Sequence, residues 1–169
     1  KDIVFFYFDP ATFRSKYINQ DRQKDKGMET EFTWSVTPKI KIKGGYVFVD
    51  GAFYTVQDGK DTSFSSLLRR PKHSGNVQAA MQFSKRLLVN TSLQFAGKRK
   101  DMYFDNNSYQ TIDVELSPYA LWNIYTSYRL TDHLQIMVDL RNITDTRYTE
   151  ISGFNTLRFN GYAGVRLEW

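Results

Sequence analysis

The sequence predicts an all-β fold, an antiparallel transmembrane β-barrel to which this chain contributes about eight strands. Three observations predict it. Polar and apolar side chains alternate with period two along most of the 169 residues, many alternating segments reach about ten residues or more, and short connections alternate with long polar ones. Strands of soluble proteins cluster near five or six residues, whereas a tilted strand needs roughly 9–11 residues to cross a membrane.

The alternation can be followed from strand to strand. In the segment 39–49, Ile40 and Ile42 fall on one face, and Lys41 and Lys43 fall on the other. The same division recurs in the other segments, since successive side chains of a strand point to opposite sides of a sheet. The predicted strands cover residues 3–8, 29–36, 39–49, 76–83, 86–95, 122–130, 134–141 and 160–169.

The connections between these strands alternate in length. The short connections are 37–38, 85–86 and 131–132. The long connections are 9–26, 57–68, 105–116 and 151–156. Barrels of the outer membrane combine short turns on one side with long polar loops on the other. The alternation therefore favours a membrane barrel over a soluble sandwich or a lipocalin-like barrel.

The pattern alone does not decide which face points inward. In a soluble β-barrel binding protein the apolar face packs inside, whereas in a membrane barrel it meets lipid and the polar face lines a wet lumen. A complete eight-stranded barrel with a filled interior, serving as an adhesin, anchor or membrane enzyme, is a further alternative. In the favoured interpretation the lumen is lined by Lys41, Lys43, Gln78, Gln82, Asn90, Gln94, Asp139 and Arg141.

Composition excludes several classes of site. The absence of cysteine excludes a disulfide scaffold, a zinc–thiolate site and a cysteine nucleophile. The only histidines, His73 and His133, have no acidic residues at metal-site spacing, so we expect no metal, no cofactor and no catalytic role. The net charge of +5 is spread over alternate strand positions and turns, which argues against nucleic-acid binding. The 13 Phe, 11 Tyr and 3 Trp suit the girdles where a barrel meets lipid headgroups.

The last ten residues, 160–169, form an alternating strand that closes on an aromatic side chain. This segment resembles the C-terminal signal that the barrel-assembly machinery of the outer membrane reads. The positions that carry the resemblance are Tyr162, Gly164, Leu167 and Trp169.

Three earlier segments resemble TonB-dependent outer-membrane transporters. In 138–148, the residues Asn142, Asp145 and Tyr148 match the polar positions of a segment near the end of those proteins, although Ile143 and Thr144 replace the commoner leucine and phenylalanine. The run Leu-Arg-Arg-Pro-Lys-His-Ser-Gly at 68–75 resembles the beginning of a strand in cobalamin and siderophore receptors. The run Lys-Gly-Met-Glu-Thr-Glu at 26–31 resembles the beginning of another strand. Within the family, the vitamin B12 receptor branch is the most similar.

The resemblance implies a barrel of about 22 strands filled by an N-terminal plug domain, with residues 1–169 supplying about the last eight. The plug and the TonB-binding segment are then absent from this chain, which we expect to begin within a longer protein. The implied function is energy-coupled uptake of a bulky nutrient, a corrinoid or an iron–siderophore chelate, across the Gram-negative outer membrane, with the C-terminus in the periplasm. The implied partners are outer-membrane lipid, the plug and the remaining strands, the TonB–ExbB–ExbD system, the barrel-assembly machinery and a surface lipoprotein.

The resemblance also gives roles to two groups of side chains. Cations of the polar face are expected to contact the plug: Lys41, Lys43, Arg86, Arg141, Arg147 and Arg166. Aromatic and polar residues in or beside the long loops are expected to contact the ligand: Tyr103, Asp105, Asn106, Asn107, Tyr109, Tyr148, Phe154 and Asn155. His73, which follows Arg69 and Arg70, is expected to face the lumen near its outer rim.

Overall fold

The computed structural model describes residues 3–9, 13–20, 22–57, 60–64 and 68–169. These residues form twelve β-strands joined by turns and irregular segments. Within them, no helix is long and apolar enough to cross a membrane. The strands are β1 (Ile3–Asp9), β2 (Arg14–Gln20), β3 (Arg22–Thr37), β4 (Ile40–Gln57), β5 (Lys60–Phe64), β6 (His73–Gln82), β7 (Leu87–Ala96), β8 (Arg99–Asp105), β9 (Gln110–Leu116), β10 (Tyr119–Arg129), β11 (Leu134–Arg141) and β12 (Asn160–Leu167).

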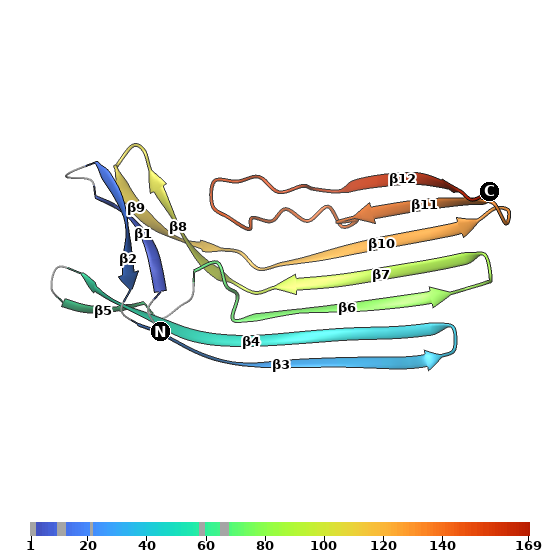
Figure 1. Ribbon diagram of the computed structural model, residues 1–169, viewed down its shortest axis with the longest axis horizontal. Coiled ribbons are helices and arrows are strands. Elements are labelled where there is room, and N and C mark those ends of the chain that lie inside the picture. The colour runs from blue at the N-terminus through green and yellow to red at the C-terminus, as the bar shows by residue number, and fades with distance from the viewer. Residues whose placement is uncertain (1–2, 10–12, 21, 58–59, 65–67) are drawn as a thin grey trace.

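Seven long strands form one antiparallel sheet in the order β12-β11-β10-β7-β6-β4-β3, and the short β5 pairs with β4. Figure 1 shows these strands side by side, with the tight β3–β4, β6–β7 and β10–β11 turns at one end, together with the C-terminus. The longer excursions of the chain, which carry β1, β2, β5, β8 and β9, lie at the other end. The predicted alternation of short and long connections is therefore confirmed.

The long connections at 9–26, 57–68 and 105–116 are not irregular throughout, since each of these segments contains a strand. β2 and β5 lie in the first two, and β9 pairs with β8 to form a hairpin in the third. In addition, β1 pairs with β2 in a separate two-stranded sheet and does not join the main sheet. Backbone ladders can continue beyond the apolar part of a barrel because a strand in water needs no apolar face. The polar composition of these connections therefore does not indicate that their backbone is irregular.

The main sheet is a single layer with one apolar and one polar face. Its register places Phe32, Gly44, Val77, Leu93 and Trp122 next to one another in one cross-strand row. These apolar side chains are not packed in a core, since Leu93 is 48% exposed. The apolar face also carries Met28, Trp34, Ile42, Tyr46, Phe48, Phe95, Ile136, Val165 and Leu167. An exposed apolar surface of this extent needs a covering, and the lipid of a membrane is suited to provide it.

Phenyl rings on the apolar face explain two glycines of the sheet. The ring of Phe32 lies over Gly44, and a Cβ at that position would collide with the ring. The ring of Phe95 lies over Gly75, where a Cβ would be 2.7 Å from the ring edge. Aromatic side chains that cover a cross-strand glycine help to fix the register of a sheet.

His73 lies on the apolar face, so the prediction that it faces the lumen is wrong. The register pairs His73 with Phe48, and their ring centroids are 5.2 Å apart. The Tyr46 hydroxyl oxygen lies 2.6 Å from Nδ1 of His73. The cations that precede His73 suggested a polar setting, but β6 begins only at His73 and the phase of the strand is set by the apolar residues that follow.

Candidate functional site

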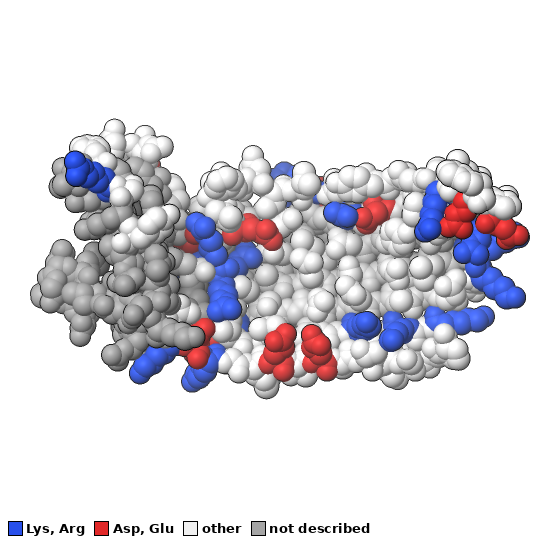
Figure 2. All heavy atoms as spheres, viewed as in Figure 1, with Lys and Arg blue, Asp and Glu red and all other residues white. Residues whose placement is uncertain are grey.

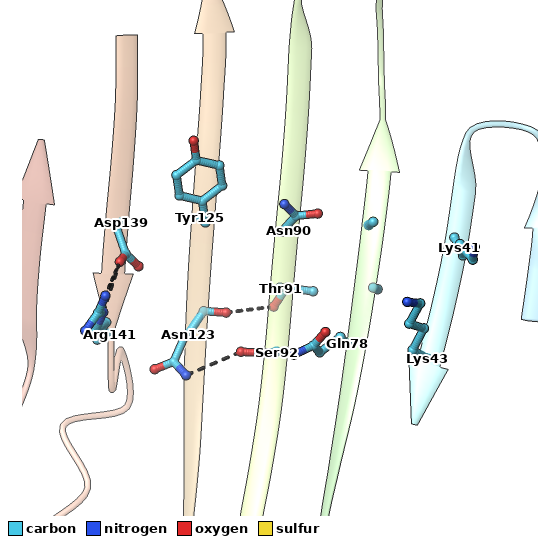
Figure 3. A pocket seen from close by; sticks show the side chains of 12 residues that line it. Lys41, Lys43, Gln78, Asn90, Thr91, Ser92, Asn123, Tyr125, Asp139 and Arg141 are labelled. Carbon is cyan, nitrogen blue, oxygen red and sulfur yellow. Dashed lines mark hydrogen bonds and ion pairs between the residues drawn. The ribbon is translucent and has the colours of Figure 1, made fainter. Parts of the chain in front are cut away.

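The polar face of the sheet contains a cavity of about 620 Å³, which is the first candidate site. Its lining comes from five neighbouring strands because the register aligns their polar positions. One cross-strand row consists of Lys41, Ala80, Asn90, Tyr125 and Asp139. Further side chains around the cavity are Lys43, Gln78, Ser92, Asn123 and Arg141. Figure 3 shows these side chains gathered over one stretch of the sheet.

Few polar side chains of this cavity form hydrogen bonds or ion pairs with one another. Asn123 Nδ2 donates to Ser92 Oγ at 3.3 Å, and Arg141 Nη2 lies 2.8 Å from Asp139 Oδ2. The Arg141 guanidinium lies over the ring of Tyr162, 5.2 Å from its centroid. Across the described part of the chain, no three His, Asp or Glu side chains are grouped to hold a metal ion. The side chains of this cavity can therefore form hydrogen bonds with a polar surface that lies against them, and they are suited to binding such a surface.

Charge is concentrated along the two long edges of the polar face. Figure 2 shows acidic and basic side chains over β3 and β4 at one edge and over β11 and β12 at the other. Lys41 and Lys43 form no ion pair with any described residue, so their charge is not neutralised by the described part of the chain. Between the edges lies a neutral strip, formed by Asn76, Gln78, Asn90, Ser92, Gln94, Asn123, Tyr125 and Ser127.

A second candidate site lies among the longer connections, around the carboxylate of Asp101. Asp101 belongs to β8 and is only 1% exposed. Arg69 Nε donates to one carboxylate oxygen at 2.7 Å, and the Ser152 backbone N–H donates to the other at 2.7 Å. The carboxylate thus connects the segment before β6, the β8–β9 hairpin and the segment between β11 and β12. We call this group, Arg69, Asp101 and Ser152, the loop junction.

Arg99 reinforces the loop junction from the same strand. It is buried, and its Nη2 donates to the carbonyl oxygen of Thr149 at 2.8 Å. Its guanidinium also lies over the ring of Tyr119, 4.8 Å from the centroid, and the Tyr119 hydroxyl donates to Glu150 at 2.9 Å. These contacts again connect β8 with the segment after β11. Arg99 and Asp101, both on β8, therefore hold the β8–β9 hairpin against the segment between β11 and β12.

The loop junction is expected to weaken in acid. Burial opposes ionisation of Asp101, but hydrogen bonds from the Ser152 N–H and from Arg69 outweigh it and hold the pKa of Asp101 below its ordinary value. A carboxyl whose pKa is lower in the folded state stabilises the fold above the unfolded-state pKa of about 3.9, and the contribution is lost as pH falls below that value through the folded pKa.

We therefore expect the hydrogen-exchange protection of the Ser152 amide, corrected for the intrinsic rate, to stay constant from about pH 7 to 5 and to fall below about pH 4. Protection that already declines between about pH 7 and 5 would mean that another group with a higher pKa controls the junction.

The segment after β11 takes its path from two residues with left-handed backbone. Asn142 has φ 49° and Asp145 has φ 52°, a conformation that asparagine and aspartate tolerate better than most residues. The buried Asn142 side chain accepts from the N–H of Thr146 and donates to its carbonyl. Asp145 accepts from the Phe159 N–H at 3.1 Å and pairs with Arg158. Two of the positions that carried the sequence resemblance therefore build this turn.

The cations expected on the polar face divide into two groups. Arg86 lies in the turn before β7, and Arg147 lies in the segment after β11, so neither occupies a polar-face position of a long strand. The predicted strand at 86–95 began one residue too early, and the alternation does not continue past Arg141. The other four lie at polar-face positions of spanning strands: Lys41, Lys43, Arg141 and Arg166.

The residues expected to contact ligand lie on two separate connections. The β8–β9 hairpin carries Tyr103, Asp105, Asn106, Asn107 and Tyr109. The segment after β11 carries Tyr148, Phe154 and Asn155. Tyr109 and Phe154 are exposed by 79% and 70%, whereas Tyr148 packs against Tyr119 with ring centroids 4.6 Å apart. Asp105 accepts the backbone N–H of Asn107 at 3.2 Å and so closes the hairpin turn.

The residues of the C-terminal signal are divided between the two faces. Tyr162 and Gly164 lie on the polar face, opposite Asp139 and Met137 of β11. Leu167 ends β12 on the apolar face, and Trp169 lies beyond the strand with its side chain fully exposed.

Sequence reasoning missed Asp101, Arg99 and Arg69. The partners of Asp101 lie 32 and 51 positions away along the chain. Nothing in the local pattern around 97–105 separates a buried carboxylate from the solvated charges on either side. No signal short of the tertiary arrangement could have identified this group.

An exposed apolar face, a hollowed polar face, tight turns at one end and long extensions at the other define the wall of a membrane β-barrel. The chain belongs to the TonB dependent receptor-like β-barrel family, whose model matches residues 1–143. This family is located in the outer membrane of Gram-negative bacteria. The family and the fold class predicted from the sequence are confirmed.

Individual relatives agree with the family. The chain is 26% identical over 137 residues to the metal-pseudopaline receptor CntO of Pseudomonas aeruginosa, covering 76% of this chain and 18% of the receptor. The ferripyoverdine receptor of the outer membrane of the same organism superposes with a TM-score of 0.70 at 22% identity, covering 94% of this chain and 21% of the receptor. The ferric-catecholate import receptor Fiu of Escherichia coli K12 superposes with a TM-score of 0.68 at 18% identity, covering 90% and 22%.

The chain spans about a fifth of the length of these relatives. At their low sequence identity the two structural matches show the fold. All three relatives are receptors and not enzymes, in agreement with the prediction that the chain has no catalytic role.

Proposed function

We propose that this chain forms part of the barrel wall of a TonB-dependent outer-membrane receptor that takes up a metal chelate. The observation that carries the proposal is the two-faced single-layer sheet, in which exposed apolar side chains cover one face and a polar cavity lies on the other. Such a sheet is suited to separate lipid from a wet lumen. Membership of the family supports the coupling of uptake to TonB.

The polar face is the surface for an N-terminal plug in this proposal. Lys41 and Lys43, which have no ionic partner among the described residues, attract acidic groups of the plug, while Arg141 is already paired with Asp139. The plug receives the pull of the TonB–ExbB–ExbD system, and the wall stays in place. The apolar face contacts outer-membrane lipid, and the C-terminal strand is presented to the barrel-assembly machinery during insertion.

The tight turns and the C-terminus face the periplasm, and the longer connections face the outside. The observation behind this orientation is that the short turns lie at one end of the sheet and the extensions at the other (Figure 1), because outer-membrane barrels place their longer loops outside the cell. The loop junction is then on the outer side, where it holds three connections in a fixed relation to an arriving ligand.

The proposed ligand is a metal–siderophore chelate. Sequence resemblance alone left corrinoids and iron chelates open, but the relatives of this chain are named for metal-pseudopaline and ferripyoverdine, which favours a metal chelate. The exposed rings of Tyr109 and Phe154 lie on the outer connections and offer apolar faces to such a ligand.

The first test is the intact mass and N-terminal sequence of the native polypeptide that carries these residues, isolated from outer membranes. We expect a single chain several times larger than the 19.8 kDa of these 169 residues. A mature protein of 19.8 kDa with no co-purifying partner would instead indicate a small closed barrel.

The second test is growth of the source organism under metal limitation with and without this receptor. We expect the intact strain to use iron or other metal chelates that the deletion strain cannot use, and we expect deletion of TonB to abolish the difference. If growth on cobalamin requires the receptor and growth on metal chelates does not, the metal-chelate assignment is wrong and the transporter class still holds.

A further inference from the structure

The apolar face ends abruptly at the outer ends of β3 and β4. On β4 it runs from Ile40 beside the tight turn to Phe48, eight positions or roughly 26 Å along the strand. The next outward-facing pair in the register is Lys26 and Asp50, and the pair after that is Lys24 and Ala52. The change from apolar to charged side chains therefore occurs within one step of the ladder.

A cavity of about 440 Å³ lies at this boundary. Its lining contains Lys24, Asp25, Lys26, Asp50, Gly51, Ala52 and Lys72. Because Lys24 and Lys26 share the face of Met28 and Phe48, the cavity adjoins the surface that lipid covers. It is distinct from the cavity of the polar face, with which it shares no lining residue.

The cavity has an excess of positive charge. Lys72 Nζ lies 2.8 Å from Asp50 Oδ1, and nearby Arg70 Nη1 lies 3.5 Å from Asp25 Oδ2. These two ion pairs use both carboxylates. The exposed Lys24 and Lys26 form no ion pair with any described residue, so among the described side chains Lys24, Lys26, Arg70 and Lys72 are four cations beside two acids.

The neighbouring aromatic side chains mark the depth of this cavity in a membrane. Tyr46, Phe48 and His73 lie together on the apolar face just below it, and the Tyr46 hydroxyl lies 2.6 Å from His73 Nδ1. Aromatic rings with a polar tip prefer the boundary between hydrocarbon and headgroups. The ammonium groups of Lys26 and Lys24, one and two ladder steps further out, therefore lie at headgroup level, where they meet lipid phosphates.

We propose that Lys24 and Lys26, with Lys72 beside them, bind a phosphate group of a lipid headgroup in the outer leaflet. The ligand is a phosphorylated membrane lipid whose acyl chains lie against the apolar face while its phosphate enters the cavity. The inference rests on the orientation given in the proposed function, in which the longer connections face outward. The site anchors one edge of the wall to the membrane at a fixed depth.

The experiment uses the complete native receptor, purified in detergent and freed of lipid, with bisphosphorylated hexa-acyl lipid A as the probe and native mass spectrometry as the readout. We expect specific lipid A adducts, and we expect the double variant Lys24→Gln, Lys26→Gln to bind about thirtyfold more weakly, since each cation at a lipid surface contributes about 1 kcal/mol. The control variant Lys39→Gln, Lys85→Gln removes the same charge at the tight turns and is expected to bind as the parent does.

Three further probes separate the sources of binding. Fully dephosphorylated lipid A is expected to bind weakly to both parent and variants because it has no phosphate. Phosphatidylethanolamine is expected to bind more weakly than lipid A because its ammonium group offsets its single phosphate charge, and inorganic phosphate is expected to compete poorly because it lacks the acyl chains. The proposal is overturned if the parent and the Lys24/Lys26 double variant bind lipid A equally. It is also overturned if the parent binds dephosphorylated lipid A as tightly as bisphosphorylated lipid A. The single variants, each checked for folding by heat-modified gel mobility, provide the same test if the double variant does not fold.

Failure of this inference can be told from failure of the proposed function. If chelate-dependent growth requires the receptor but lipid A binding ignores Lys24 and Lys26, the lipid site alone is wrong. If lipid A binding depends on the two lysines but no metal chelate requires the receptor for uptake, the transport assignment alone is wrong.

Discussion

Replacing Leu93 with arginine is expected to destabilise the folded barrel in a bilayer by about 2–4 kcal/mol. Leu93 lies between Val77 and Trp122 in a cross-strand row of the apolar face, and its side chain is 48% exposed. In lipid, a guanidinium at this position has neither water nor a counter-ion. The measurement is the free energy of folding of the native receptor into phosphatidylcholine vesicles, obtained from urea titration.

The neighbouring residue provides the control. Gln94 belongs to the neutral strip on the opposite face, so Gln94→Arg is expected to change the free energy of folding by no more than about 0.5 kcal/mol. The two substitutions introduce the same side chain one position apart and differ only in the face that receives it. If Leu93→Arg is tolerated and Gln94→Arg is costly, the apolar face is the interior of a soluble-type barrel.

Replacing Asp101 with asparagine is expected to separate the three connections that meet at the loop junction. Asparagine presents an NH₂ group where one carboxylate oxygen accepts from Arg69 or from the Ser152 N–H, and it removes the charge that Arg69 pairs with. The loss of charge-assisted hydrogen bonds is expected to lower the local opening free energy by about 2–3 kcal/mol. Hydrogen exchange near Ser152 is then roughly 30- to 150-fold faster, while the spanning strands keep their protection.

Asp113→Asn is the matched control for this change. Asp113 lies on the partner strand β9, opposite Met102, and its side chain is exposed. We expect no measurable change in exchange near Ser152 for this variant. Equal exchange in the Asp101 and Asp113 variants would show that the junction does not hold the connections together. Accelerated exchange throughout the spanning strands would show instead that Asp101 supports the whole fold.

Much of the spanning sheet could be predicted from the sequence because the membrane imposes its requirement on every second residue. The lipid-facing positions Ile40 and Ile42 and the intervening Lys41 and Lys43 already reveal the two faces, since period-two alternation is a local property of a strand. The turns that join spanning strands were predictable for the same reason, because each is the break between two alternating runs. The polar lining around Lys41 follows directly from this phase and the register.

The loop junction could not be predicted because its contacts connect segments that are far apart in sequence. Burial of Asp101 depends on which connections meet beyond the ends of the long strands, and that is decided by contacts between segments 32 and 51 positions apart. Extra-membrane strands such as β9 escaped prediction because no apolar environment marks their phase. His73 shows a related limit, since flanking cations describe the neighbours of a residue and not the side to which its ring points.

The neutral strip has a mechanical consequence for whatever rests against the polar face. Amide and hydroxyl groups exchange a partner for water with a net change of only about 0.5–1.5 kcal/mol per hydrogen bond, whereas complementary charges mainly fix the orientation of a partner. The charges lie at the two margins, near β4 and β11, and the middle of the wall offers only groups such as Asn90, Ser92 and Asn123. A partner that binds this face is oriented by the charges at the two margins of the sheet. Its central contacts are hydrogen bonds that water can replace, so the partner can leave and bind again without rearrangement of the wall.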